Sequence, residues 1–259
     1  MEQAVRKIAL LGMGTVGGGV YEIIERQKEE MPFKIGAALE VVKVLVRNKA
    51  KYADRIPAEK LTDVWEDVIG DDSIDIVVEV MGGIEPARTY IKAALEKGKH
   101  VVTANKDLMA MHGHELLELA GEHHCDLLFE AAVAGGIPII RPLKQCLAGN
   151  NITEIMGIIN GTTNFILTKM THEGMEFDEA LALATELGYA EADPTADIEG
   201  HDACRKIAIL TSLVCGQQVD FQDIHTEGIT KITSDDIRYA KEFGYVIKLL
   251  GVTKRSEER

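Results

Sequence analysis

The sequence predicts an α/β fold in which a doubly wound parallel sheet is followed by an α+β domain. Two observations predict it. Short apolar strands alternate with amphipathic helices over the first 135 residues. This alternation stops after a glycine-rich turn at residues 134–138. We therefore expect one domain over residues 1–135 and a second over residues 136–259.

Five apolar runs predict the strands of the first domain. They are residues 7–11, 40–46, 74–81, 100–103 and 127–130. The second and third runs are rich in β-branched residues, as in strands that are buried on both faces of a parallel sheet. Helical spacing of apolar residues predicts helices at 14–27, 87–97 and 108–124. Pro86 fits a first helical turn, and Gly98 fits the position just past a helix end.

The second domain shows one strong strand, at residues 152–159, which ends in Asn160-Gly-Thr-Thr-Asn164. Helical patterns follow at residues 165–172, 177–187, 199–215 and 235–250. A single strand cannot make a stable sheet by itself. We therefore expect a C-terminally truncated chain whose second domain is incomplete.

Composition and charge exclude several classes of protein. The chain has 28 Lys and Arg against 42 Asp and Glu, a formal charge of −14. Such a charge repels a nucleic-acid backbone, and no basic run offsets it. The apolar runs are far shorter than the roughly 20 residues that span a bilayer, and the N-terminus lacks an export signal. We expect a cytoplasmic protein that binds neither nucleic acid nor membrane.

The cysteines lack the spacing of a metal site, whereas one acidic group could suggest a divalent metal. The four cysteines lie far apart and lack paired spacing, so we expect buried free thiols: Cys125, Cys146, Cys204 and Cys215. One acidic group with a histidine matches no established metal-site spacing: Asp193, Asp197 and His201.

A glycine-rich loop follows the first predicted strand and opens the first helix. Its sequence, Gly12-Met13-Gly14-Thr15-Val16-Gly17, fits the G-x-G-x-x-G motif of Rossmann-type dinucleotide-binding domains. In that motif the first glycine allows a tight turn, the second lets the backbone approach a pyrophosphate, and the third lets helix and strand pack closely. The alternative is a turn that serves packing alone.

The end of the second strand indicates which dinucleotide binds. An acidic residue there favours NAD, whereas an arginine accommodates the 2′-phosphate of NADP. Here the strand is followed by Arg47-Asn48-Lys49, without a carboxylate. The sequence therefore favours NADP, although a solvated loop arginine is the alternative.

Two lysines lie in segments that indicate chemistry. Lys106 comes just past a buried strand that ends at Thr103, at the edge where open α/β sheets bind ligands. Asp202 and Lys206 are four residues apart on a predicted helix and share one face. The alternative for Lys106 is a solvated lysine without a function. The alternative for Asp202 and Lys206 is a surface ion pair worth under about 1 kcal/mol.

Taken together, five segments in order resemble homoserine dehydrogenase. They are the glycine loop, Thr103-Ala-Asn-Lys106, Glu130 through Pro138, Asn160-Gly-Thr-Thr-Asn164, and Gly188-Tyr-Ala-Glu191-Ala-Asp193-Pro194 with Asp202 and Lys206. The resemblance implies NAD(P)H-dependent reduction of L-aspartate 4-semialdehyde to L-homoserine, in threonine, methionine and isoleucine biosynthesis. It also implies a homodimer.

The resemblance also assigns roles to residues. Glu191 and Asp202 would bind the substrate amino group, and Lys206 would donate the proton to the aldehyde oxygen. Lys106 would lie beside the nicotinamide, with Thr103 in the same cofactor-binding segment. A monovalent cation, Na⁺ or K⁺, would be held largely by backbone oxygens of one loop: Glu130, Val133, Gly135 and Ile137.

Two other functions remain open at this stage. One is another amino-acid-pathway oxidoreductase of similar two-domain build. Aspartate semialdehyde dehydrogenase would need a catalytic cysteine, and no cysteine here lies in a nucleophile context. The other is a non-catalytic NADPH sensor, which would need none of the acidic and lysine side chains assigned above.

Overall fold

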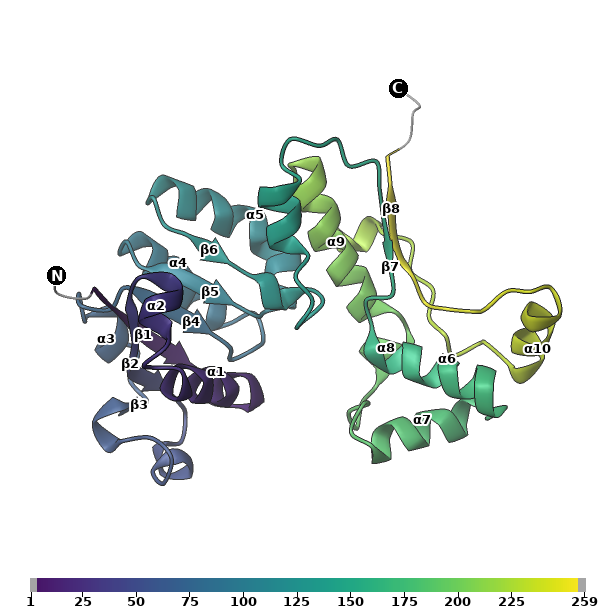
Figure 1. The fold of residues 1–259 in the computed structure, drawn as a ribbon, viewed down its shortest axis with the longest axis horizontal. Helices are drawn as coiled ribbons and strands as arrows, with labels where there is room; N and C mark the ends of the chain where they lie inside the picture. Colours follow the sequence, from purple (N-terminus) through teal and green to yellow (C-terminus); the bar gives the residue numbers. More distant parts are fainter. Residues whose placement is uncertain (1–3, 256–259) are drawn as a thin grey trace. The chain divides into compact units, whose positions relative to one another are not determined.

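The computed structural model describes residues 4–255, and the chain divides into two compact units between Ile137 and Pro138 (Figure 1). Each unit has its own buried core. Among the described residues, no helix is both long and apolar enough to cross a membrane.

The first unit contains a six-stranded sheet in which every neighbouring pair is parallel. The strand order is β3-β2-β1-β4-β5-β6. The strands are β1 (Val5–Leu11), β2 (Ala38–Leu45), β3 (Leu61–Thr62), β4 (Ile76–Glu79), β5 (His100–Thr103) and β6 (Leu127–Leu128). The order reverses at β1, so the doubly wound prediction is confirmed. Strand β3 was not predicted, because two residues are too few to show a periodic pattern.

Helices pack along this sheet. They are α1 (Thr15–Arg26), α2 (Met31–Ile35), α3 (Glu66–Ile69), α4 (Ala87–Glu96) and α5 (Lys106–Glu122). Helix α1 contacts β2, α4 contacts β4 and β5, and α5 contacts β6. Gly98 follows α4 with a φ of +75°, so the predicted glycine stop is confirmed. Short 3₁₀ turns lie at η1 (Lys49–Tyr52), η2 (Ala58–Lys60) and η3 (Glu130–Ala132).

The second unit is mainly helical. Its helices are α6 (Gly161–Glu173), α7 (Phe177–Glu186), α8 (Thr195–Ile198), α9 (His201–Cys215) and α10 (Ser234–Glu242). A π-helical turn, η4 (Pro142–Cys146), precedes them, and a 3₁₀ turn, η5 (Phe221–Asp223), follows α9. Ile166, Leu167 and Met170 of α6 are buried in its core with Ala180 and Ala184 of α7.

The expectation of a single strand in the second unit was wrong. Strand β7 (Glu154–Gly157) pairs antiparallel with β8 (Gly251–Lys254), which lies beside it in Figure 1. The predicted helix at 235–250 is correspondingly shorter, because α10 ends at Glu242 and Gly244 follows in the left-handed conformation. The apolar run beyond Gly244 fits a helix and a strand equally well, and the pairing with β7 decides between them.

The cysteines are all unpaired, but the expectation that they are buried was wrong for two of them. Cys204 is buried and Cys125 is partly buried, whereas Cys146 and Cys215 are exposed. Burial raises the pKa of the Cys125 thiol, with a smaller contribution from neighbouring Asp126.

Candidate functional site

The glycine loop after β1 has the geometry that its motif predicts. Gly12 has a φ of +99°, and a Cβ there would lie 2.8 Å from the carbonyl oxygen of Val80. A Cβ on Gly17 would lie 2.2 Å from the carbonyl oxygen of Gly12, so only glycine allows α1 to pack this closely. A Cβ on Gly14 would meet no atom within 4 Å. The backbone of Gly14 is therefore open to a ligand at the N-terminus of α1.

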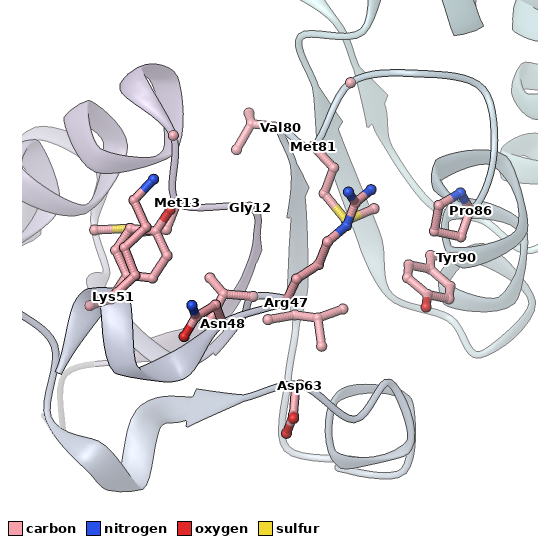
Figure 2. Close-up of a pocket in the computed structure, with 15 residues that line it drawn as sticks. Gly12, Met13, Arg47, Asn48, Lys51, Asp63, Val80, Met81, Pro86 and Tyr90 are labelled. Atoms are coloured by element: carbon pink, nitrogen blue, oxygen red, sulfur yellow. The ribbon is translucent and has the colours of Figure 1, made fainter.

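A cavity of about 460 Å³ opens at this loop, at the carboxyl ends of the strands where the sheet order reverses (Figure 2). Residues that follow four strands line it: Gly12, Met13 and Gly14 after β1, Val46, Arg47 and Asn48 after β2, Asp63 after β3, and Val80, Met81 and Gly82 after β4. Such a position is the usual ligand crevice of an open α/β sheet. In Figure 2 the Arg47 side chain extends toward Met81 across the cavity.

One wall of the cavity is aromatic. Tyr90 and Pro86 line it, and the Tyr90 ring stacks on Trp65 with centroids 4.1 Å apart and an interplanar angle of 13°. The stack joins α4 to the segment before α3. It gives the cavity an apolar side.

A carboxylate in this cavity was missed by the sequence analysis. Strand β3 pairs with β2, and the backbone N–H of Val46 donates to the carbonyl oxygen of Thr62 over 2.9 Å. This pairing brings Asp63, from a different segment, beside the end of β2, where residues 45–49 themselves carry no carboxylate. The Asp63 carboxylate accepts a hydrogen bond from Lys49, which lowers the pKa of Asp63.

A second missed residue, Glu79, lies fully buried at the end of β4. Its Oε1 accepts the backbone N–H groups of Met81 and Gly82 over 2.8 and 3.2 Å. Its Oε2 accepts the Thr103 hydroxyl over 2.6 Å. The side chain thus ties the loop that lines the cavity to the end of the neighbouring strand β5.

The same network continues to the start of α5. Thr103 Oγ1 accepts the backbone N–H of Asn105 over 3.0 Å, and Asn105 Oδ1 caps the helix by accepting the N–H of Leu108. The Asn105 amide also donates to the carbonyl oxygen of Gly83 over 2.6 Å. Lys106 is the first residue of α5, so this network fixes its backbone relative to the Met81–Gly83 loop.

The second unit contains a separate polar cluster around α9. Lys206 Nζ donates to Asp202 Oδ2 over 2.6 Å and to the carbonyl oxygen of Ile159 over 2.9 Å. The Asp202 side chain is 4% exposed, so this pair is not a solvated surface ion pair. An ammonium group has three N–H donors. Two of those of Lys206 are used within the described residues, which leaves one for a ligand.

Asn160 organises this cluster. Its amide Nδ2 donates to Asp197 Oδ1 over 2.7 Å and to Asp202 Oδ2 over 2.9 Å. Its Oδ1 accepts the backbone N–H and the hydroxyl of Thr163, both over 2.8 Å. Because the oxygen faces two donors and the nitrogen faces two carboxylates, the orientation of the amide is unambiguous. One side chain therefore caps α6 and holds two carboxylates near Lys206.

Glu191 lies exposed in the loop that follows α7. That loop is tied to α6 twice. The Thr162 hydroxyl donates to the carbonyl oxygen of Tyr189 over 2.8 Å, and the Tyr189 ring stacks on Phe165 with centroids 4.7 Å apart. The structure thus fixes the backbone two residues before Glu191.

The loop expected to hold a cation is a tight turn. Glu130 begins the 3₁₀ turn η3, Val133 is buried, and Ile137 is exposed. Ala134 has a φ of +51°, and its carbonyl oxygen accepts the N–H of Ile137 over 2.7 Å. Within residues 4–255, no group of three or more His, Cys, Asp or Glu side chains could hold a metal ion.

Comparison with known proteins identifies relatives for both units. A family model described as homoserine dehydrogenase matches residues 138–257, and one described as the NAD binding domain of homoserine dehydrogenase matches residues 12–130. The homoserine dehydrogenase of Bacillus subtilis (strain 168) is 49% identical over 250 residues, which are 96% of this chain and 58% of that relative.

Solved structures similar to this chain are also homoserine dehydrogenases. The crystal structure of a homoserine dehydrogenase from Thiobacillus denitrificans has a TM-score of 0.93 and 48% identity, covering 98% of this chain and 60% of that chain. A hyperthermophilic archaeal homoserine dehydrogenase in complex with NADPH has a TM-score of 0.80 and 30% identity, covering 98% and 83%. The chain thus spans less than two thirds of the length of the Bacillus and Thiobacillus proteins.

The Glu79 network makes a prediction about stability. Thr103→Val keeps the side-chain shape but removes a donor to Glu79 and an acceptor for Asn105. We expect a loss of about 1–3 kcal/mol in the free energy of unfolding, because buried polar groups lose their partners. Urea denaturation followed by circular dichroism measures it. The control is Thr89→Val, whose exposed hydroxyl bonds only Glu85. Equal losses in the two variants would contradict the role given to Glu79.

Proposed function

The chain belongs to the homoserine dehydrogenase family, and we propose that it carries the cofactor-binding and substrate-binding residues for reversible NADPH-dependent reduction of L-aspartate 4-semialdehyde to L-homoserine. This reaction would serve the biosynthesis of threonine, methionine and isoleucine. The observation that carries the proposal is the Lys206 ammonium group, which is held by Asp202 and by the Ile159 carbonyl with one N–H to spare. The exposed, unpaired Cys146 and Cys215 suit the reducing cytoplasm, where we place the protein.

The cavity of the first unit suits a dinucleotide. Gly12 allows the tight turn, and Gly17 lets α1 pack closely against it. The open backbone of Gly14 together with Met13, Thr15 and Val16 would face the pyrophosphate at the N-terminus of α1. Arg47 would bind the 2′-phosphate of NADPH. Thr103 and Lys106 belong to the edge that we assign to the nicotinamide.

The roles of the side chains follow from the chemistry of carbonyl reduction. Bound NADPH supplies the hydride, so the protein has to orient the carbonyl group and stabilise the charge that develops on its oxygen. Lys206 orients the carbonyl group and stabilises this charge by donating a hydrogen bond from its remaining N–H to the oxygen. It then transfers that proton to the oxygen. Lys106 contributes positive charge at the cofactor edge.

The substrate is also an amino acid, whose ammonium group needs negative partners. Asp202 is held by Asn160 and Lys206, and Glu191 lies in the loop fixed by Thr162. We assign both carboxylates to the substrate ammonium group, because charge-assisted hydrogen bonds are the strong ones.

The loop after β6 would bind a monovalent cation, Na⁺ or K⁺. Its donors are oxygens, which hard cations prefer. Oxygens of Glu130, Val133, Gly135 and Ile137, largely backbone carbonyl groups, would supply them. The tight turn that begins at Ala134 keeps these carbonyl groups within one short segment.

We also propose a homodimer that uses the β7–β8 sheet. Met156 and Val252 lie opposite each other on its outer face and are 58% and 45% exposed. Two-fold pairing of such a face is a common way to cover it. Light scattering at high protein concentration should give twice the mass of one chain, and a monomeric mass would contradict the proposal.

The 2′-phosphate assignment predicts the effect of Arg47→Ala. Loss of a charge-assisted hydrogen bond should weaken NADPH binding by about 1–3 kcal/mol and leave NADH binding nearly unchanged. Fluorescence titration with both reduced cofactors measures this. Arg26→Ala is the charge-matched control, because Arg26 is the last residue of α1 and the glycine loop lies at the first. Equal weakening of both cofactors by Arg47→Ala would contradict the assignment.

The reaction itself is tested by NADPH formation from NADP⁺ and L-homoserine. Lys206→Ala should lower kcat by roughly 10²–10⁴ and leave cofactor binding intact, because a general acid acts in the transition state. Lys169→Ala is the matched control, since Lys169 forms an i,i+4 pair of the same 2.6 Å length with Glu173. A wild-type chain that binds NADP⁺ and L-homoserine but forms no NADPH would contradict the proposed reaction. Near-normal turnover by Lys206→Ala would contradict the role of Lys206.

A further inference from the structure

Charged residues from two segments of the chain lie around the end of β2. Arg47 and Lys51 follow β2, and Asp63 follows β3. All three line the cavity that we assign to the cofactor. A 2′-phosphate there would be attracted by the two cations and repelled by an uncompensated carboxylate. The partner of Asp63 therefore matters for cofactor choice.

That partner is Lys49 and not Arg47. Lys49 Nζ lies 2.7 Å from Asp63 Oδ1. Arg47 forms no hydrogen bond or ion pair with any residue in the described part of the chain, although the β2–β3 pairing places it near Asp63. In Figure 2 the Arg47 and Asp63 side chains point in opposite directions. Lys49 thus neutralises the carboxylate while the Arg47 guanidinium stays available to an anion.

The ion pair contributes little to stability. Both side chains are about half exposed, 48% for Lys49 and 46% for Asp63, and exposed pairs are weak in water. Its effect is local, because it cancels a negative charge beside the subsite that would hold the 2′-phosphate.

Resting on the proposed cofactor site, we propose that the Lys49–Asp63 ion pair determines the preference for NADPH over NADH. With Lys49 in place, Asp63 neither pairs with Arg47 nor repels the 2′-phosphate. Without Lys49, the carboxylate competes for Arg47 and becomes an acceptor for a ribose 2′-hydroxyl, which is how acidic residues select NAD. Lys49 and Asp63 are therefore specificity-determining residues, although only the second lines the cavity.

A double-mutant cycle tests this inference. NADPH and NADH are titrated into the wild type, Lys49→Met, Asp63→Asn and the double variant. The single tryptophan, Trp65, stacks on the cavity residue Tyr90, so energy transfer to the bound reduced nicotinamide reports binding.

We expect Lys49→Met to lower the ratio of NADPH to NADH affinity by about tenfold, and Asp63→Asn to raise it by about threefold, as for nearby charges partly screened by water. The double variant removes both charges, so its ratio should return to within about twofold of the wild type. Lys60→Met and Asp54→Asn make the same changes in charge outside the cavity lining and should leave the ratio unchanged.

Three outcomes would overturn the inference, and they are distinguishable. If the wild type binds neither cofactor, both the proposed function and this inference are wrong. If the wild type binds NADPH but neither single variant changes the affinity ratio, the inference alone is wrong. If the variants weaken both cofactors equally and lower the melting temperature, the ion pair is merely structural and the inference is again wrong.

Discussion

The cofactor-binding edge of the first unit depends on one buried carboxyl group. Glu79 is inaccessible to solvent, and a group so deeply buried is tolerated only when its oxygens are hydrogen-bonded. Its donors come from the Met81–Gly82 backbone and from Thr103, so satisfying Glu79 shapes the cavity loop and sets the end of β5 at the same time. The position of Lys106 at the start of α5 follows from this arrangement through the Asn105 cap.

In the second unit, the amide side chain of Asn160 provides hydrogen bonds to two carboxylates. Asp197 and Asp202 are like charges that would repel each other, and the two N–H groups of Asn160 bind one each. Lys206 adds a positive charge at Asp202, which offsets part of that repulsion. Such a cluster suits a substrate with an ammonium group and a reactive carbonyl oxygen. Hydrogen bonds within the chain therefore orient the polar groups near the proposed chemistry, as electrostatic preorganisation requires.

The sequence predicted the features that local chain geometry determines. The roles of Gly12 and Gly17 follow from a short turn, and the Asp202–Lys206 pair follows from helical spacing. The features it missed depend on contacts between distant segments. Glu79 is the last residue of β4 and was included in an apolar run, and Asp63 reaches the cavity only because β3 pairs with β2. Strand β8 likewise becomes a strand through β7, about 95 residues earlier in the chain. Periodicity carries no information about such partners.

We propose that the first unit binds NADP(H) with its 2′-phosphate at Arg47. The most direct measurement is a ³¹P NMR pH titration of the 2′-phosphate of NADP⁺ bound to this chain. A guanidinium beside the phosphate favours the dianion, so the account predicts that the pKa of the phosphate falls on binding. A bound-state pKa equal to that of free NADP⁺, or above it, would contradict the account.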